Sequence, residues 1–147
     1  MKNYQTPSRK IEFYSSRALP ENTPLPVQVP ISCDTDEFIL LNSSMPKWTH
    51  TQFMDVYGLI PSIAWINPLD AERLGIKTGE KITLYNDLAE LKITPVITGK
   101  IRKGVMWMPR ELKDSFDNIQ NSLTPGIPQK LGGGPIFNSV KVRVKKE

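Results

Sequence analysis

The stretch "INPLDAERLGIKTGEKITLYN", residues 66–86, decides the fold, because it packs a strand end, a short helix, two glycines and a second strand into very little chain. Asn67 is well placed as a helix N-cap, with Pro68 at the first helical position and Asp70 in the first turn against the helix dipole. Gly75 is a natural C-terminal stop. The pattern favours structural capping for Asn67 and Asp70, and a role in a site stays open.

Short strands are expected on both sides of this reversal. Alternating or apolar runs predict strands at residues 36–44, 61–68, 80–87, 89–100, 104–112 and 140–147, with the helix at 69–76. Strands 80–87 and 89–100 meet at a turn near Asn86 and Asp87. The chain has 147 residues, one domain's worth, and its 13 prolines against 9 glycines favour many short elements joined by stiff loops. A β-rich protein is therefore predicted.

Two segments lack such periodicity. Residues 17–32 hold four prolines, which favour an extended segment laid over a surface, so residues 1–32 are interpreted as a lead-in arm before a domain at 33–147. Residues 113–138 form a long run rich in Asn, Gln, Pro and Gly, and a loop of that length is usually functional or disordered.

Composition excludes several classes of protein. The net charge is +4, and the basic finish "VKVRVKKE" at 140–147 is interpreted as a solvated strand face rather than a nucleic-acid patch. Cys33 is the only cysteine and His50 the only histidine, so a dense His/Cys metal cluster is excluded and Cys33 is expected to be a buried, inert thiol. The sequence has neither a signal-peptide pattern nor an apolar run of membrane-spanning length, so a soluble cytoplasmic chain is expected.

Enzyme motifs are missing as well. The sequence contains no GxGxxG, GxxxxGK[ST], HExxH or GxSxG pattern, and nothing marks a nucleophile that His50 would serve. A self-contained hydrolase is therefore disfavoured.

Two stretches nevertheless gather ligand-binding groups. "NSSMPKWTHT", residues 42–51, places hydroxyls, an amide, a lysine, an indole and an imidazole at the end of a buried strand, which suits a polar planar ligand with phosphates. "KLGGGPIFN", residues 130–138, has three glycines that let backbone N–H groups approach an anion. A polar surface loop and a flexible turn are the plain alternatives for the two stretches.

Taken in order, these pieces resemble the C-terminal molybdopterin-dinucleotide-binding domain of molybdenum and tungsten oxidoreductases of the dimethyl sulfoxide reductase family. The stretch 66–86 resembles the family's "NPxDAxxLGIxxGDxVxV" signature, and "GVMWMP" at 104–109 resembles its "GVVFMP". The lead-in "KIEFYSS", the loop "THTQF", "NSLTP" and the closing "GPIFNSVKVRV" match in the same order, so the resemblance covers nearly the whole chain.

The resemblance implies a six-stranded double-psi β-barrel with short helices, in which Gly75 and Gly79 permit positive φ at tight reversals. It also implies a bis(molybdopterin guanine dinucleotide) cofactor with molybdenum or tungsten. The cofactor-binding residues that it suggests are Asn42, Ser43, Ser44, Lys47, Trp48, Thr49, His50, Thr51, Asn67, Asp70, Arg110, Asn121 and Asn138. Asn67 and Asp70 would either lie near a guanine or hold the loop that does.

The chain departs from the family in two respects. Many relatives carry an arginine where this sequence has Ser44 and Met45, and Lys47 or Arg110 is a substitute for that cation. The sequence also lacks a recognisable metal ligand and a CxxC set for an iron–sulfur cluster, so no complete active site is expected in this chain alone. An excised C-terminal domain and a separate small subunit both fit, and "KIEFYSS" favours the first.

The hypothesis from sequence is a cofactor-binding domain or small subunit whose partner is a catalytic large subunit or the preceding domains of the same oxidoreductase. No nucleic acid partner and no membrane insertion are expected. The rival hypothesis is a stand-alone double-psi barrel that acts as a protein-interaction adaptor, and a weaker rival is a nucleic-acid binder on the basic final strand.

Overall fold

Six strands and three short helices lie within the residues that the structure describes. The computed structural model describes residues 3–15, 19, 24–25, 28, 30–110, 119–129 and 133–147. In chain order the elements are β1 (Phe38–Ser43), α1 (Met54–Tyr57), β2 (Ile63–Ile66), α2 (Pro68–Leu74), β3 (Ile82–Tyr85), β4 (Glu90–Ile97), β5 (Val105–Pro109), the 3-10 helix η2 (Gln120–Leu123) and β6 (Val140–Lys146). Each of the strands predicted from the sequence is present.

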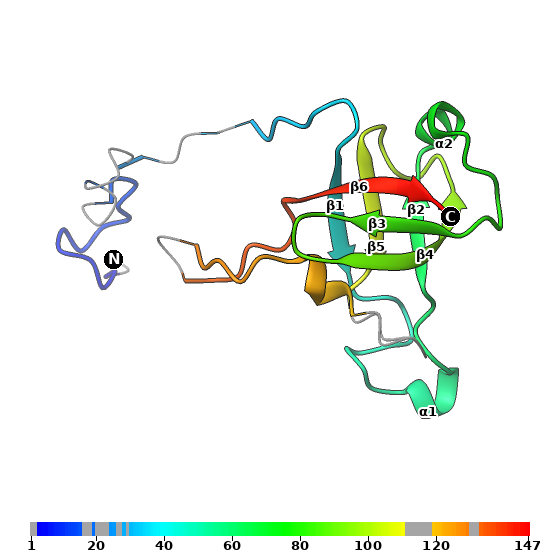
Figure 1. Ribbon diagram of the computed structural model, residues 1–147. Coiled ribbons are helices and arrows are strands. Elements are labelled where there is room, and N and C mark those ends of the chain that lie inside the picture. Colours follow the sequence, from blue (N-terminus) through cyan, green and yellow to red (C-terminus); the bar gives the residue numbers. More distant parts are fainter. Residues whose placement is uncertain are drawn as a thin grey trace.

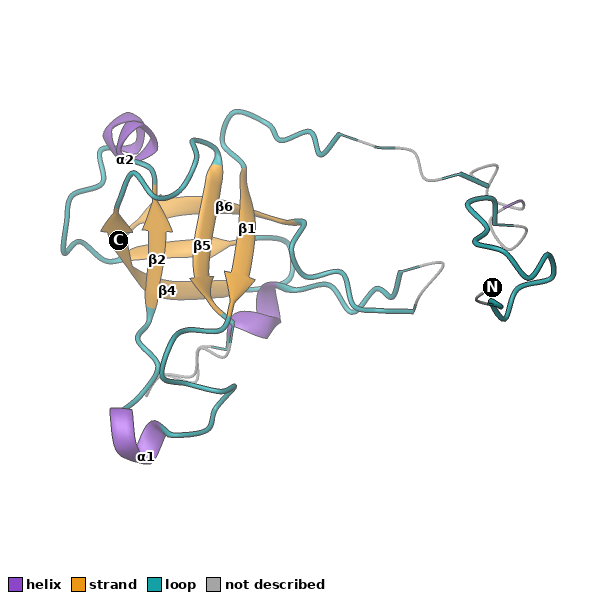
Figure 2. Ribbon diagram, turned by 180° about the vertical axis from the view of Figure 1, so that it is seen from behind, coloured by secondary structure: helices purple, strands orange, loops and turns teal. Residues whose placement is uncertain are grey.

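The strands close into a barrel in the order β1-β5-β2-β4-β3-β6. β1 pairs with β5 and β2 pairs with β4 in parallel, while the remaining neighbours are antiparallel. Figures 1 and 2 show two layers, with β1, β5 and β2 on one side and β6, β3 and β4 crossing them on the other. The predicted six-stranded double-psi β-barrel is confirmed.

The barrel interior is filled with apolar side chains, most of them aliphatic. β1 shows how strand alternation supplies them, since Phe38 and Leu40 are fully buried while Ile39 and Leu41 are half-buried. Leu40 lies opposite Val140 of β6, which brings the first and last strands together and closes the barrel. Because side chains from all six strands meet inside, the barrel holds a packed core rather than a channel.

Helix α2 begins and ends where the sequence predicts. The side chain of Asn67 accepts a hydrogen bond from the Leu69 N–H (3.0 Å), and Pro68 occupies the first turn. Gly75 ends the helix with φ 65°, and Gly79 has φ 86° in the following turn. Both glycines adopt the positive φ that other residues resist.

The turn between β3 and β4 is organised by Asn86. Its Oδ1 accepts hydrogen bonds from the N–H groups of Leu88 (3.0 Å) and Ala89 (3.2 Å), which confirms the turn predicted at this point. Its Nδ2 donates to the carbonyl of Leu123 in η2 (2.8 Å). A single amide side chain therefore fixes both the hairpin and the 3-10 helix.

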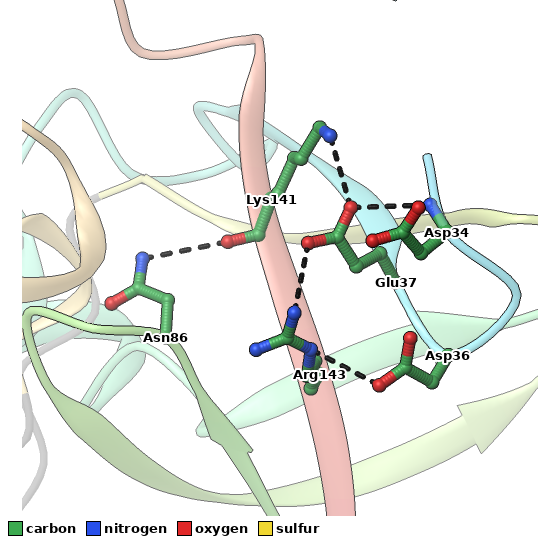
Figure 3. A network of polar contacts seen from close by, with 6 residues as sticks. All are labelled: Asp34, Asp36, Glu37, Asn86, Lys141 and Arg143. Carbon is green, nitrogen blue, oxygen red and sulfur yellow. Dashed lines mark hydrogen bonds and ion pairs between the residues drawn. The ribbon is translucent and has the colours of Figure 1, made fainter. Parts of the chain in front are cut away.

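A network of charged side chains joins the entry of β1 to β6 (Figure 3). Glu37 accepts from Lys141 Nζ (2.9 Å) and from the Arg143 guanidinium (3.2 Å), and Arg143 Nε lies 3.1 Å from Asp36 Oδ2. The Asp34 N–H also donates to Glu37 (3.2 Å). The hydrogen bonds from Lys141 and from the Asp34 backbone hold the pKa of Glu37 below its ordinary value.

The basic final strand carries its charges outward, as predicted, and they are neutralised by neighbours. Besides Lys141 and Arg143, Lys145 lies 2.7 Å from Glu90 on β4. A small cavity of about 170 Å³ lies between this strand and the β3 turn. Its lining residues are Glu37, Tyr85, Asn86, Asp87, Lys141, Val142 and Arg143.

The prediction for Cys33 is wrong, because its side chain is exposed. Cys33 precedes β1 in a polar segment that the barrel leaves on its surface, so no strand carries it into the core. Partial burial nevertheless raises the pKa of the thiol, and the carboxylates of Glu37 and Asp34 add to the increase. The predicted arm over a surface at 17–32 falls largely outside the described residues, and Leu25 and Ile31 within it are about half exposed.

Candidate functional site

The candidate site lies at the end of the barrel where β1 and β5 finish. These strands are parallel, with Ser43 opposite Pro109, so β1 and β5 end at the same place on the barrel. The Arg110 N–H donates to the Ser43 carbonyl (3.1 Å), which extends the pairing by one residue. Asn42, Ser43 and Arg110, predicted from separate parts of the sequence, are thus neighbours.

The segment before β6 completes this end. The Asn138 side chain accepts a hydrogen bond from the Asn42 backbone N–H (3.1 Å), and Asn42 Nδ2 donates to the Phe137 carbonyl (3.0 Å). The antiparallel pairing of β1 with β6 brings these residues together across 96 positions of sequence. Three distant segments therefore meet around Asn42, which is only 4% exposed.

Two buried polar atoms at this end have no hydrogen-bond partner in the part of the chain that the structure describes. They are the acceptor Oδ1 of Asn42 and the donor Nε of Arg110. Both lie close to Phe137, whose carbonyl binds the Asn42 amide and whose ring centre is 5.1 Å from the Arg110 guanidinium carbon. Burying such an atom unpaired costs about 1–3 kcal/mol, so an unpaired donor and acceptor together indicate a place for a ligand.

Ser43 is also held in position. Its Oγ accepts a hydrogen bond from the indole N–H of Trp107 (2.9 Å), which leaves the Ser43 O–H able to donate outward. Trp107 in turn packs against Trp65, with ring centroids 4.5 Å apart. The tryptophan of "GVMWMP" is therefore a positioning residue for the site, and sequence reasoning did not assign it that role.

The loop from Ser44 to Phe53 continues from β1 and carries most of the other predicted residues. Ser44, Lys47, Thr49, His50 and Thr51 are exposed on it. Figures 1 and 2 show this loop and α1 beyond the strands, on the side away from α2. The predicted groups are thus displayed at the same end as Asn42.

The backbone of that loop is strained. Lys47, His50 and Phe53 have φ values of 80°, 53° and 67°, in the left-handed region that glycine normally occupies. Each costs of order 1 kcal/mol, and such residues cluster at functional sites. The strain is an independent sign of function in the loop that holds His50.

Trp48 packs within the loop. Its indole N–H donates to the Gly58 carbonyl (3.0 Å), and its ring meets Tyr57 edge-on at a centroid distance of 6.2 Å. Lys47 Nζ lies 5.7 Å from the centre of the same Tyr57 ring. Trp48, which the family resemblance suggests as a cofactor-binding residue, thus packs within its own loop.

Asn67 and Asp70 lie at the opposite end of the barrel. Besides capping α2, Asn67 donates from Nδ2 to the Ile101 carbonyl (2.8 Å). Asp70, 1% exposed, accepts from the Gly104 N–H (2.7 Å) and has Arg73 at 3.7 Å. Together they fix the turn that precedes β5. Their separation from Asn42 follows from the antiparallel pairing of β2 with β5.

Asn121 lies on η2 and its side chain is exposed. The helix is anchored by the buried Leu123, whose carbonyl binds Asn86. Asn86 and Phe137 are further positioning residues that the sequence reasoning missed. An asparagine at a predicted turn was the available signal for Asn86, while nothing local marks Phe137.

Two other kinds of functional feature are absent from the described residues. No group of three or more His, Cys, Asp and Glu side chains lies together there as a metal site. No helix in the same residues has the length and apolar character needed to cross a membrane. The glycine segment 130–138 is described only from Gly133, which has φ 64°.

Comparison with known proteins identifies the family. Residues 39–141 match the profile of the family described as "Molydopterin dinucleotide binding domain". The match covers most of the chain, and the protein belongs to this family. The matched region includes the ends of β1 and β5 at the candidate site and the loop from Ser44 to Phe53.

Curated relatives are much longer proteins. The chain is 28% identical over 153 residues to the probable oxidoreductase YoaE of Bacillus subtilis, covering 96% of this chain and 22% of that protein. It is 31% identical over 172 residues to the dimethyl sulfoxide reductase DmsA of Haemophilus influenzae, covering 97% and 21% respectively. The Escherichia coli DmsA gives 31% over 173 residues, covering 96% and 21%. The chain thus spans about a fifth of the relatives it matches.

Among solved structures, acetylene hydratase from Pelobacter acetylenicus has a similar fold. The TM-score is 0.70 at 18% identity, over 99% of this chain and 24% of that one. At this identity the likeness concerns the fold.

Proposed function

We propose that the Asn42 end of the barrel binds the pterin part of a molybdopterin guanine dinucleotide carrying molybdenum or tungsten, within a larger oxidoreductase. The observation that carries the proposal is that Asn42 Oδ1 and Arg110 Nε, on two residues that both contact Phe137, are buried without a partner among the described residues. A pterin edge alternates N–H donors with ring nitrogen and carbonyl acceptors, so it satisfies an acceptor and a donor at once. The donor set therefore fits the cofactor that the family name describes.

Each site residue is proposed to have a role that follows from its hydrogen-bonding groups. Asn42 accepts from a pterin N–H and Arg110 donates to a ring acceptor, while Asn138 and Phe137 keep the Asn42 amide oriented. The Ser43 O–H donates outward because Trp107 occupies its acceptor side. Fixed groups of this kind orient the ligand without reorganising on binding.

The exposed side chains of the loop from Ser44 to Phe53 are proposed to line the approach to the Asn42 end of the barrel. Lys47 contributes positive charge for phosphate, and Ser44, Thr49, His50 and Thr51 contribute hydrogen bonds, with Asn121 contributing from η2. Trp48 holds the loop together. When bound, the cofactor supplies the metal-centred redox chemistry.

Asn67 and Asp70 are proposed to stabilise the fold rather than to contact the cofactor. Their hydrogen bonds cap α2 and fix the turn 101–104, from which β5 runs to Arg110. This supports the role of holding a loop over that of touching a guanine.

The partner is proposed to be the remainder of an oxidoreductase, either preceding domains of one chain or a large catalytic subunit. The chain spans about a fifth of its relatives, so the rest of the cofactor site lies in the other four fifths. Within this chain, residues 1–32 are proposed as a lead-in arm and residues 33–147 as the cofactor-binding domain.

Cofactor content tests the proposal. The tagged chain is coexpressed with a second polypeptide from the same genome, in a host that makes the cofactor. This second polypeptide is the one whose sequence matches the part of the relatives that the present chain does not cover. Oxidised pterin is measured by fluorescence, the released nucleotide by chromatography and the metal by mass spectrometry. We expect pterin in the purified complex and at least a tenfold lower content with Arg110→Met or Asn42→Leu.

Arg102→Met is the matched control, since Arg102 is an exposed arginine in the turn at the opposite end of the barrel. It should retain pterin. Thermal unfolding of each variant shows that the barrel is intact. Full pterin content in both site variants would contradict the proposal and favour the adaptor hypothesis.

A further inference from the structure

An apolar knob projects from the candidate-site loop. It consists of four large side chains, Phe53, Val56, Tyr57 and Leu59, which are 48%, 64%, 49% and 62% exposed. Helix α1, which carries two of them, has no buried residue. Soluble proteins rarely cluster exposed side chains of this size unless the cluster meets a partner.

The knob has a defined shape. The Tyr57 N–H donates to the Phe53 carbonyl (2.9 Å) and the Gly58 N–H to that of Met54 (3.0 Å). The hydrogen bond from the Trp48 indole N–H to the Gly58 carbonyl (3.0 Å) ties the start of the loop to the residue that follows α1. The apolar groups are thus held outward by the loop's own bonds.

Phe53 shows that the knob is not built for local stability. It occupies the N-cap position of α1 with φ 67° and offers no capping side-chain bond. A glycine, serine or asparagine would suit that position better. Left-handed strain combined with an exposed aromatic ring indicates that this residue's role lies in contact with another molecule.

We infer that the apolar knob docks into an apolar groove on the part of the oxidoreductase that lies outside this chain, with a basic residue of that polypeptide facing Asp55. This inference rests on the proposed function. The knob follows His50 and Thr51 directly in the loop, so a polypeptide that shares the cofactor reaches the knob as well. The relatives are about five times as long as this chain and so contain further polypeptide beyond the matched part.

Charge at the knob favours protein over membrane. Asp55 lies in the first turn of α1 and is exposed between the apolar groups. Asp55 offsets the charge of Lys47, whose Nζ lies 5.7 Å from the Tyr57 ring centre, so the knob offers no basic cluster to anionic lipid headgroups. The same carboxylate is compatible with a basic side chain at the rim of a protein groove.

Capture by the partner tests the inference. The probe is the coexpressed polypeptide that matches the other four fifths of the relatives, and the ratio of the two chains is measured after purification through a tag on that polypeptide. The double variant Val56→Asp, Leu59→Asp should reduce capture at least tenfold. Leu69→Asp is the control, because Leu69 is 60% exposed on α2 at the opposite end and should stay within twofold of the unchanged chain.

The outcomes separate this inference from the proposed function. Capture that persists in the double variant, or that fails for the unchanged chain, overturns the docking inference. If the chain self-associates and the double variant abolishes this association, the knob binds a second copy of the chain. If the chain binds phosphatidylglycerol vesicles through the knob, the knob binds a membrane. Either result also overturns the docking inference. A complex that the double variant disrupts but that contains no pterin supports docking and contradicts the proposed function. A complex that contains pterin and persists in the double variant supports the proposed function and contradicts docking.

Discussion

The backbone N–H of Asn42 donates to the side-chain oxygen of Asn138 at 3.1 Å, across 96 positions of sequence. This bond joins the end of β1 to the residue two positions before β6, at the place where the strands close the barrel. The same asparagine pair carries the candidate site, because Asn42 also presents the unpaired acceptor Oδ1. This contact therefore contributes both to the closure of the barrel and to the construction of the site.

Removing that contact should destabilise the barrel. Asn138→Ala leaves the Asn42 N–H without its acceptor in a buried position, at a cost of about 1–3 kcal/mol. Urea unfolding followed by tryptophan fluorescence measures the change. Asn138→Asp keeps an acceptor oxygen and should stay close to the unchanged protein, so equal losses in both variants would argue against the hydrogen bond.

The role of Asp70 can be separated from ligand binding without any cofactor. Asp70→Ala removes the acceptor for the Gly104 N–H and should lower the free energy of unfolding by about 1–3 kcal/mol. Glu72→Ala, an exposed change on the same helix, should have an effect within about 0.5 kcal/mol. If Asp70 served only to contact a guanine, the cofactor-free chain would show no difference between the two variants.

Gly79 provides a test of the compact reversal itself. Its φ is 86° and nothing lies within 4 Å of an added Cβ, so Gly79→Ala introduces backbone strain without a clash. We expect a loss of about 1–2 kcal/mol in thermal or urea unfolding. Gly99 also has open space but not a positive φ, so Gly99→Ala should be neutral or slightly stabilising. Equal effects at both positions would remove the conformational explanation.

The Glu37 network predicts how stability depends on pH. Hydrogen bonds from Lys141 and the Asp34 backbone depress the pKa of Glu37 in the folded protein below its ordinary value of 4.5. A depressed carboxyl pKa contributes stability that is present above the unfolded pKa and is lost as pH falls through the folded pKa. Unfolding measured from pH 7 downward should therefore show a loss below about pH 4.5 that is smaller in Glu37→Gln.

Lys141 gives the complementary prediction at high pH. Its hydrogen bond to Glu37 raises the pKa of Lys141 above its ordinary value of 10.5. That contribution is present below the unfolded pKa and is lost as pH rises through the folded pKa. An unchanged acid slope in Glu37→Gln would show that the network of Figure 3 does not couple to folding in solution.

Local features of this protein could be predicted from sequence because their causes are local. The caps of α2 depend on Asn67, Pro68 and Gly75, all within one short stretch, and all three occur as expected. The apolar run at 36–44 likewise predicted a buried strand, and Phe38 and Leu40 of β1 are fully buried. The barrel topology came from resemblance to a family, since periodicity alone does not determine which strands pair.

Non-local features were not predictable. The Trp107 bond to Ser43 depends on the register of β1 against β5, and the contact of Asn86 with Leu123 joins segments 37 positions apart. Cys33 was assigned to the interior from its residue type, whereas its position before β1 leaves it exposed. The roles of the individual site residues in cofactor binding stay predictions until the pterin measurements are made.

The pairing of β1 with β6 has a consequence for biosynthesis. Neither Asn138 nor the strand that follows it exists while the ribosome is still making the earlier strands, so the acceptor for Asn42 arrives last among the barrel segments. During translation the Asn42 end stays an open sheet edge with its polar groups in water. Under the proposed function, the cofactor site at this end is complete only after synthesis of residues 137–142, because Phe137 and Asn138 orient Asn42.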